Sequence, residues 1–323
     1  MIVVTGGAGF IGSNIVKELN RQGREDILIV DDLKDGQNYK NLRGLKFFDY
    51  MHKDNFLEAI ENEEFDNTDI EVIFHEGACS DTMEYDVNYM MRTNYEYSKS
   101  MLHFCLGQRI PFMYASSAST YGGGENGFTE GDECEDALNP YAYSKLLFDR
   151  YVRQLLPDAK SQVVGLKYFN VYGPQEHHKG KMASIFYQLY NQIKDTGVAK
   201  LFEGYDGYGN GEQRRDFVFV GDVVKVNLWF WQHQGPSGIY NCGTGHAHSY
   251  NEAARAVIDA LGAGHIEYRE FPEVLKGKYQ SFTEADPTNL LATGYDQGFT
   301  PMAEAVAYYV DFLNQGGYFK YGK

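Results

Sequence analysis

The chain has 323 residues, 43% hydrophobic and 23% charged, which is typical of a globular protein with a large core. Its formal net charge of −16 argues against a nucleic acid or an anionic membrane surface as a partner. The four cysteines show no metal-ligand spacing, and no signal peptide or membrane span is evident, so we expect free thiols, no metal and a cytoplasmic location.

Strands and helices alternate through the first half of the chain. Apolar runs predict strands at residues 2–5, 27–31, 45–48, 71–75, 111–115 and 162–168. Between them the sequence predicts helices at residues 11–22, 53–61, 88–107 and 141–155. Because the strands are mostly continuous apolar runs separated by helices, we expect an α/β fold with a doubly wound, Rossmann-type parallel sheet.

The pattern loosens after residue 170. Loops are predicted at 171–182 and at the glycine-rich 204–213, a helix at 183–195, and short helices and loops over 242–323. Residues 216–233 are expected to form a strand and a helix that return to the large lobe. We therefore expect one domain of residues 1–170 with 216–241, and a smaller mixed α/β lobe of residues 171–215 and 242–323.

A glycine-rich run joins the first strand to the first helix. Residues 6–12 match the pattern GGxGxxG. Glycines at these positions let the backbone turn tightly and approach a pyrophosphate, while the helix starting at Phe10 and Ile11 directs its N-terminal amides at the phosphates. The larger domain is therefore interpreted as a dinucleotide-binding domain.

The end of the second strand bears on the choice of dinucleotide. Asp31 is placed to accept hydrogen bonds from the 2′-hydroxyl of the adenosine ribose, which favours NAD. A 2′-phosphate, as in NADP, would require basic residues nearby. Lys34, Lys53 and Arg24 are the candidates, so these residues leave the choice open.

Ser117, Tyr141 and Lys145 form a second constellation. Tyr141 and Lys145 are four residues apart on a predicted helix and share one face. The ammonium of Lys145 is expected to lower the pKa of Tyr141 toward neutrality and to hold the nicotinamide ribose. Ser117 follows a strand and can hydrogen-bond a substrate oxygen. Together with the glycine run, the set predicts hydride transfer to and from a nicotinamide.

From end to end the chain resembles the extended short-chain dehydrogenase/reductases, the group of nucleotide-sugar epimerases and dehydratases. The motifs that carry this resemblance are the glycine run, Asp31, residues 75–78 (HEGA), Asn94, residues 116–117 (SS), 141–145 (YAYSK), 168–174 (YFNVYGP) and 215–218 (RDFV). Other motifs resemble the ADP-glyceromanno-heptose 6-epimerases within this group. They are residues 75–80 (HEGACS), 178–180 with 182–184 (HKG and MAS), 201–204 (LFEG), 227–230 (NLWF) and 275–277 with 279–280 (LKG and YQ).

The finer resemblance implies a reaction. ADP-D-glycero-D-manno-heptose would be oxidised at C6 to a ketone by bound NADP, with NAD possible, and would receive the hydride back on the opposite face. Tyr141 and Lys179 would be the two acid/base residues, and Lys179 would need a pKa lowered by burial or by a cation such as Lys145. The resemblance also implies a role in lipopolysaccharide core synthesis and a homo-oligomer, a pentamer.

Site residues follow from the resemblance position by position. The catalytic set is Tyr141, Lys179, Lys145 and Ser117. The cofactor-binding set is Gly6, Gly9, Phe10, Ile11, Gly12, Asp31, Asp32, Lys53, Glu76, Gly77, Ala78, Cys79, Ser80, Asn94, Lys145, Val171 and Lys179. The substrate-binding set is Ser117, Asn170, Lys181, Phe202, Glu203, Gly204, Tyr205, Arg215 and Tyr279, with Arg215 expected to pair with a pyrophosphate oxygen.

Some positions depart from the heptose-epimerase pattern. Asp32 and Asn38 stand where less negative or basic residues would be expected around a 2′-phosphate, whereas Lys53 fits NADP. Lys181 stands where a small hydroxyl residue is typical, and the glycine-rich stretch 205–213 is longer than usual.

Two alternatives remain open beside the 6-epimerase. One is a UDP- or dTDP-sugar 4-epimerase, which would not need Lys179. A dehydratase is disfavoured because residues 118–120 (AST) follow Ser117 in place of an Asp-Glu pair. The other is a non-catalytic NAD(P)-sensing protein. Such a protein would be expected to lack the tyrosine or the lysine, whereas this chain keeps Tyr141 and Lys145.

Overall fold

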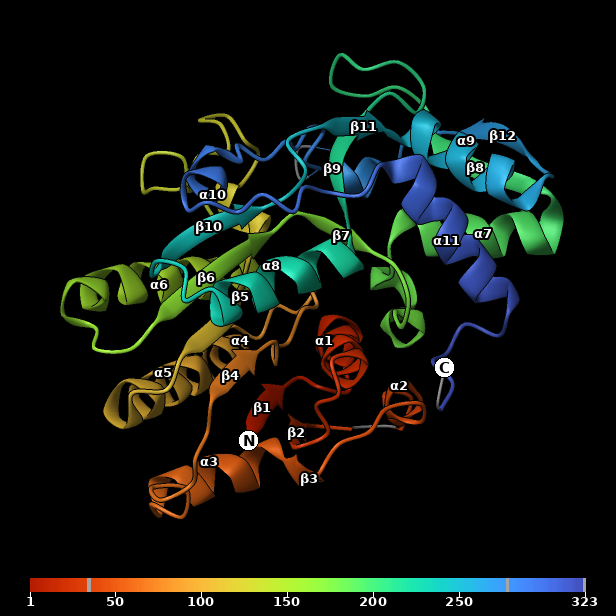
Figure 1. The fold of residues 1–323 in the computed structure, drawn as a ribbon. Coiled ribbons are helices and arrows are strands. Elements are labelled where there is room, and N and C mark those ends of the chain that lie inside the picture. The colour runs from red at the N-terminus through yellow and green to blue at the C-terminus, as the bar shows by residue number, and fades with distance from the viewer. Residues whose placement is uncertain (34–35, 277–278, 322–323) are drawn as a thin grey trace.

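The computed structural model describes residues 1–33, 36–276 and 279–321, so Lys34 and Gly277 lie outside the described residues. A seven-stranded sheet, in the order β10-β6-β5-β4-β1-β2-β3, forms the larger lobe (Figure 1). Its strands are β1 (Ile2–Thr5), β2 (Ile27–Asp31), β3 (Asp49–His52), β4 (Val72–His75), β5 (Phe112–Ser117), β6 (Val163–Tyr168) and β10 (Gly238–Cys242). Neighbouring strands are all parallel, which confirms the predicted doubly wound α/β fold.

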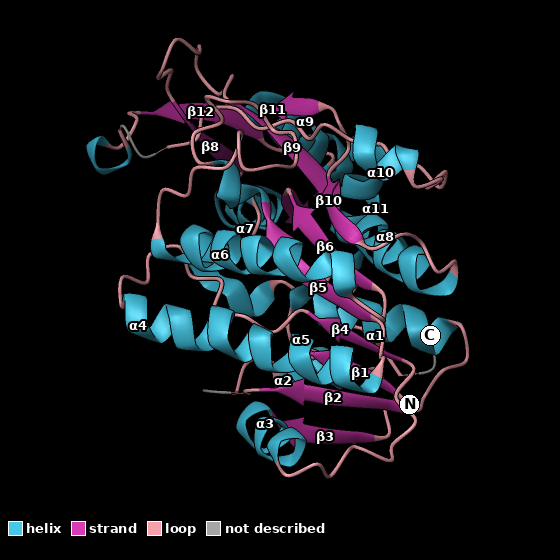
Figure 2. Cartoon of the chain, turned by 90° about the vertical axis from the view of Figure 1, so that its left-hand side faces the viewer, coloured by secondary structure: helices cyan, strands magenta, loops and turns pink. Residues whose placement is uncertain are grey.

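Helices cover both faces of this sheet (Figure 2). On one face, α1 (Phe10–Arg21) and α8 (Val220–Gln232) share a buried apolar cluster with the strands. On the other, α3 (Lys53–Glu61), α5 (Tyr97–Gln108) and α6 (Pro140–Leu155) share a second cluster. The short helix α2 (Tyr39–Leu42) contacts α1. Because strands buried on both faces are mostly apolar, the continuous apolar runs located five of the seven strands, β1, β2, β4, β5 and β6.

Several predicted boundaries are wrong in the larger lobe. The third strand is residues 49–52 instead of 45–48, because the apolar run contributes Leu45 to the core while β3 is a half-exposed edge strand. The predicted helix 88–107 is α4 (Val87–Met90), a π-helical turn at Met91–Glu96, and α5. The strand β10 was not predicted, although it pairs with β6 and completes the sheet.

The smaller lobe contains two further sheets. One has the order β11-β9-β7 and the other pairs β12 with β8. These strands are β7 (Asn170–Tyr172), β8 (Val198–Phe202), β9 (Arg214–Phe219), β11 (Ala247–Ser249) and β12 (His265–Arg269). Helices α7 (Ile185–Thr196), α9 (Tyr250–Leu261) and α11 (Met302–Asn314) pack on them around a third apolar cluster, and α10 (Thr288–Ala292) contacts β10.

The second half of the chain also differs from the sequence prediction in part. The strand predicted after residue 216 is β9, and it belongs to the small sheet, whereas the helix α8 that follows it does return to the large sheet. The predicted loop 171–182 contains β7 and a 3₁₀ turn at His177–Met182. The helix at 183–195 and the loop at 204–213 are confirmed.

Three features bear on the class of the protein. All four cysteines are free thiols. Within the described ranges, no helix has the length and apolar character needed to cross a membrane. Nor do those ranges bring together three His, Cys, Asp or Glu side chains in a group that could hold a metal ion.

Candidate active site

A cavity of about 780 Å³ opens at the carboxyl ends of the parallel strands, where doubly wound folds bind their ligands. It brings together most residues predicted to be catalytic or to bind cofactor. Those that line it are Gly6, Gly9, Phe10, Ile11, Gly12, Asp31, Asp32, Lys53, Glu76, Gly77, Ala78, Cys79, Ser80, Ser117, Tyr141, Lys145, Val171 and Lys179. Asn94 and the predicted substrate residues other than Ser117 do not line it.

The glycine run forms a cradle that side chains would fill. Gly6 has φ +67°, and the amide of Gly9 donates to its carbonyl oxygen at 2.9 Å. A Cβ on Gly12 would lie 2.2 Å from that oxygen, and a Cβ on Gly6 would lie 2.6 Å from the amide nitrogen of Gly77. Helix α1 begins immediately after, at Phe10. The loop therefore fits a closely approaching pyrophosphate.

Asp31 faces the cavity from the end of β2. Its carboxylate accepts hydrogen bonds from the backbone amides of Ala8 and Asp32, each at 2.7 Å. Burial raises the pKa of Asp31, although these bonds oppose the shift. A carboxylate held in this way has lone pairs left to accept a bond from a ribose hydroxyl. Asp31 thus fits the adenosine end of a dinucleotide.

The basic residues proposed for a 2′-phosphate lie in different places. Lys53 lines the cavity, and its ammonium pairs with Asp54 at 2.7 Å. Arg24 instead pairs with Asp26 and Glu71, which precede β2 and β4 at the opposite edge of the sheet. Its role as a phosphate partner is therefore wrong, and Lys53 remains.

Ser117, Tyr141 and Lys145 meet on one side of the cavity. All three residues line the cavity, as the sequence predicts. Lys145 is buried, which lowers its pKa to about 8, and its ammonium donates to the carbonyl oxygen of Ala115 at 2.7 Å. Burial raises the pKa of Tyr141, contrary to the expected lowering. The spacing of four residues predicts that Tyr141 and Lys145 share a helix face, but it does not predict how burial changes the pKa of Tyr141.

Lys179 enters the same cavity from the 3₁₀ turn His177–Met182. Its ammonium lies 5.1 Å from the centroid of the Phe10 ring, at the start of α1. Burial lowers the pKa of Lys179, and Glu176 opposes this shift. The direction agrees with the sequence expectation; the cause is burial, without a contribution from Lys145. A buried lysine whose pKa is lowered is a candidate proton donor and acceptor for a group bound in the cavity.

Glu76 is a buried carboxyl beside these residues. Its Oε1 accepts the hydroxyl of Tyr168 at 2.9 Å, and that hydroxyl accepts the amide of Asn227 at 2.8 Å. Its Oε2 is buried without a hydrogen-bond partner. Burial raises the pKa of Glu76 to about 7. Because unpartnered buried polar atoms are rare, this oxygen is an additional sign that the cavity receives a polar ligand.

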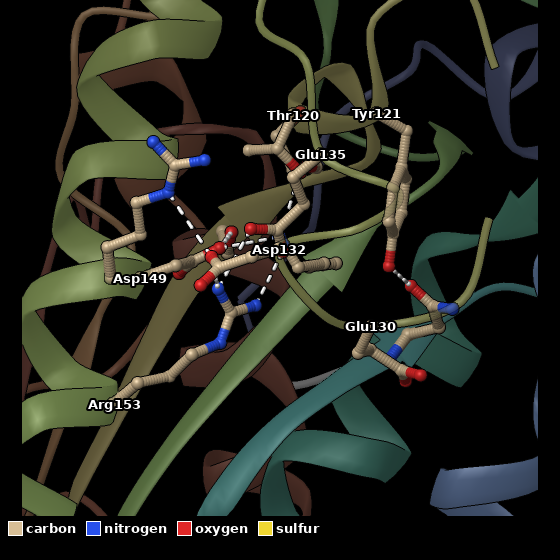
Figure 3. A network of polar contacts seen from close by, with 12 residues as sticks. Thr120, Tyr121, Glu130, Asp132, Glu135, Asp149 and Arg153 are labelled. Carbon is tan, nitrogen blue, oxygen red and sulfur yellow. Dashed lines mark hydrogen bonds and ion pairs between the residues drawn. The ribbon is translucent and has the colours of Figure 1, made fainter. Parts of the chain in front are cut away.

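A network of charged side chains connects elements that border the cavity, and Figure 3 shows part of it with Asp149, Glu135 and Arg153 labelled. The ammonium of Lys167 on β6 lies 2.7 Å from Asp149, 2.9 Å from Glu135 and 2.8 Å from the hydroxyl of Thr120. Asp149 also accepts the hydroxyl of Ser116 at 2.6 Å. The cluster therefore links β5 and β6 to α6, the helix that carries Tyr141 and Lys145. Sequence analysis missed it because its members are far apart in the chain.

Asn94 supports the cavity wall without lining it. It lies in the π-helical turn, where its side chain accepts the backbone amide of Cys79 at 2.8 Å and donates to the carbonyl oxygen of Cys79 at 2.9 Å. It also donates to the hydroxyl of Ser144 on α6 at 3.1 Å. Asn94 thus holds the segment after β4 in place, and its predicted cofactor contact stays a prediction.

Four of the predicted substrate residues gather in the smaller lobe. The guanidinium of Arg215 lies 4.9 Å from the ring centroid of Tyr279. Phe271 contacts the rings of Tyr279, Phe202 and Tyr205, with Tyr205 stacked on it at 4.4 Å. A buried arginine surrounded by aromatic rings suits a planar, anionic ligand.

Four further predicted substrate residues are exposed. Gly204 and Glu203 begin the glycine-rich loop, where the amide of Gly204 donates to Asn210. Asn170 accepts the hydroxyl of Thr283 at 3.2 Å. Lys181 is exposed on the turn that carries Lys179. No direct contact joins these residues into one site, so their roles stay predictions.

Comparison with known proteins agrees with this geometry. The family model described as "NAD dependent epimerase/dehydratase family" matches residues 2–243. The crystal structure of Helicobacter pylori ADP-L-glycero-D-manno-heptose-6-epimerase is similar at 29% identity and a TM-score of 0.83, over 97% of this chain and 96% of that one.

Sugar 4-epimerases are similar as well. Thermus thermophilus UDP-glucose 4-epimerase, solved in complex with NAD, is 26% identical with a TM-score of 0.78, over 97% of this chain and 98% of that one. Methanobrevibacter ruminantium UDP-N-acetylglucosamine 4-epimerase is 23% identical with a TM-score of 0.83, covers 98% of both chains, and shows the fold alone.

Proposed function

Because this chain belongs to the NAD-dependent epimerase/dehydratase family, we propose that it converts ADP-D-glycero-D-manno-heptose to its L-glycero epimer at C6, for lipopolysaccharide core synthesis. The observation that carries this proposal is Lys179, which lines the same cavity as Tyr141 and comes from a different element. The likeness to the Helicobacter pylori heptose epimerase supports it further.

The need for two proton-transfer groups follows from the chemistry. C6 of the heptose carries no acidic proton, so its inversion requires temporary oxidation. When bound, the nicotinamide supplies the hydride acceptor and then the donor. The two epimers present the C6 hydroxyl in opposite directions, so one fixed side chain does not easily serve both. We assign Tyr141 to one epimer and Lys179 to the other, with Ser117 holding the reacting oxygen.

For the cofactor we propose NADP, with NAD as the alternative. Three basic residues were suggested as partners of the 2′-phosphate. Of the two that the structure describes, Lys53 lines the cavity and Arg24 does not. To pair with a 2′-phosphate, Lys53 would have to leave Asp54, and Asp31 and Asp32 oppose the added charge. With NAD, Asp31 alone would hold the ribose. Lys53 is therefore the residue whose substitution decides between the two.

The remaining expectations enter the proposal together. The domain of residues 1–170 with 216–241 would bind the dinucleotide, and the lobe of 171–215 and 242–323 would bind the nucleotide sugar. Arg215 would pair with a pyrophosphate oxygen and Tyr279 would contact the nucleotide sugar, and the contact between the guanidinium and the ring of Tyr279 supports this proposal. The assembly would be a homopentamer.

Two substitutions test the assignment. Tyr141→Phe and Lys179→Met should each lower epimerisation by about 10²–10⁴-fold, the usual contribution of a positioned acid or base. Both variants should still bind the dinucleotide, as measured by calorimetry. Lys194→Met, an exposed lysine on α7, is the matched control. Wild-type turnover in either catalytic variant would contradict the assignment.

The 4-epimerase alternative makes a different prediction. The similarity to Thermus thermophilus UDP-glucose 4-epimerase is the observation in its favour. A 4-epimerase would not need Lys179. Lys179→Met would then keep its activity on UDP-glucose, whereas Tyr141→Phe would lose it.

A further inference from the structure

The segment that carries Lys179 has an unusual backbone. Gln175 is fully buried with φ +77°, and Gly180 has φ +53°. A left-handed conformation is uncommon for a residue other than glycine, and it persists only where surrounding contacts hold it. The contacts that hold residues 173–184 therefore fix the place of the Lys179 ammonium.

Asn41 on α2 makes several of those contacts, and its side chain is 1% exposed. Its amide nitrogen donates to the carbonyl oxygen of Ala8 at 2.9 Å and to that of Gln175 at 3.1 Å. The same nitrogen lies 3.2 Å from Nδ1 of His178. In return, the side chain of Gln175 donates to the backbone carbonyl of Asn41 at 3.0 Å. One buried amide thus contacts both the glycine loop and the Lys179 segment.

A second asparagine joins the same two segments. Asn14 on α1 donates to the carbonyl oxygen of Phe10 at 2.8 Å and to that of Pro174 at 2.9 Å. The Lys179 ammonium lies over the Phe10 ring in the same region. The beginning of the segment is therefore bonded to the loop and helix that form the phosphate cradle.

The other end of the segment is bonded to the smaller lobe. Glu176 is fully buried and accepts the backbone amide of Ser184 at 2.5 Å and its hydroxyl at 2.7 Å. It also accepts the hydroxyl of Tyr309 on α11 at 2.9 Å. These bonds fix Glu176 to α7 and α11. The part of the segment that faces the glycine loop is held by the side chains of Asn14 and Asn41.

We propose that Asn41 is a positioning residue for Lys179, because it couples the phosphate-binding glycine loop to the segment that presents this lysine to the substrate. The inference rests on the proposed function, in which Lys179 is one of two acid/base residues. Its consequence is specific. Loss of the Asn41 amide misplaces Lys179 and leaves Tyr141, on α6, in place. A misplacement of about 1 Å can cost on the order of 10²-fold in rate.

The first test measures oxidation from each epimer separately. Single-turnover absorbance of the reduced nicotinamide is followed with the D-glycero and the L-glycero substrate. If Tyr141 and Lys179 serve opposite epimers, Lys179→Met is slow with only one of them. Asn41→Ala and the isosteric Asn41→Asp, which lacks the donor, should be slow by on the order of 10²-fold with that same epimer and near wild type with the other.

Asn20→Ala is the matched control. Asn20 also donates from its side chain to two backbone carbonyls, those of Arg24 at 2.8 Å and Lys46 at 2.7 Å, and none of these three residues lines the cavity. It should leave both rates near wild type. If the Asn41 variants slow both epimers equally, or resemble Asn20→Ala, the proposal is overturned.

A second readout needs neither substrate nor cofactor. Reductive methylation of Lys179, followed by mass spectrometry, should be faster in Asn41→Ala than in the wild type and unchanged in Asn20→Ala. Equal protection of Lys179 in all three would overturn the positioning role. If Lys179→Met is equally slow with both epimers, the two-base function is refuted. The methylation rate of Lys179 would still decide whether Asn41 positions this lysine. If Asn41→Ala does not fold, Asn41→Asp and Asn14→Ala take its place in both measurements.

Discussion

Replacing Lys167 with methionine would remove a cation from the buried cluster that joins β5 and β6 to α6. Lys167, Asp149 and Glu135 have fully buried side chains, with the ammonium 2.7 Å and 2.9 Å from the two carboxylates. In Lys167→Met, Glu135 keeps Arg153 as a partner, whereas Asp149 keeps only the hydroxyls of Ser116 and Tyr114. Breaking a buried pair by removing one partner costs about 3–5 kcal/mol. Because two hydroxyl donors remain, we expect about 3 kcal/mol.

Urea unfolding measures this loss, provided that the m-value stays unchanged. The double variant Lys167→Met/Asp149→Asn is the control, since it removes the orphaned charge, keeps an acceptor oxygen for one of the two hydroxyls and offers an NH2 donor to the other. It should recover most of the lost stability. A loss below about 1 kcal/mol in the single variant would refute the reasoning, because a surface substitution costs nearly as much. A double variant as unstable as the single one would do the same.

Three further predictions concern the cofactor site and pH. Gly12→Ala should weaken dinucleotide binding by at least about tenfold in calorimetry, because the added Cβ would lie 2.2 Å from the carbonyl oxygen of Gly6. Gly107→Ala is the control, because its Cβ meets nothing within 4 Å, and it should leave dinucleotide binding unchanged. Lys53→Ala should weaken NADP binding more than NAD binding, and equal losses would show that Lys53 does not touch a 2′-phosphate. Burial lowers the pKa of His75 to about 3, so its neutral ring contributes stability that is present above about pH 6.5 and is lost as the pH falls toward 3. His75→Phe should therefore lose less stability than the wild type between about pH 7 and pH 5 in urea unfolding, and a parallel loss would refute this linkage.

The large sheet was predictable because its signals are local. A strand buried on both faces is mostly apolar, and a dinucleotide loop needs glycine wherever a Cβ would strike the backbone, as at Gly12. Tyr141 and Lys145 could be placed on one helix face from their spacing alone. These features depend on a few neighbouring residues, so the sequence displays them directly.

The features that were missed depend on distant partners. β3 is a half-exposed edge strand without an apolar run, and β10 is defined by its pairing with β6. The ion cluster and the contacts of Asn41 join residues that are far apart in the chain. The raised pKa of Tyr141 comes from burial, which a spacing of four residues does not reveal. Such properties arise only when separate elements pack.

The most direct test of the account is incubation with ADP-D-glycero-D-manno-heptose without added cofactor. The C6 epimers are followed by NMR, with UDP-glucose in a parallel reaction. The account predicts that the L-glycero epimer appears, because the dinucleotide ends each cycle unchanged and stays bound. Conversion of UDP-glucose alone, or of neither substrate even after NADP and NAD are added, would contradict it.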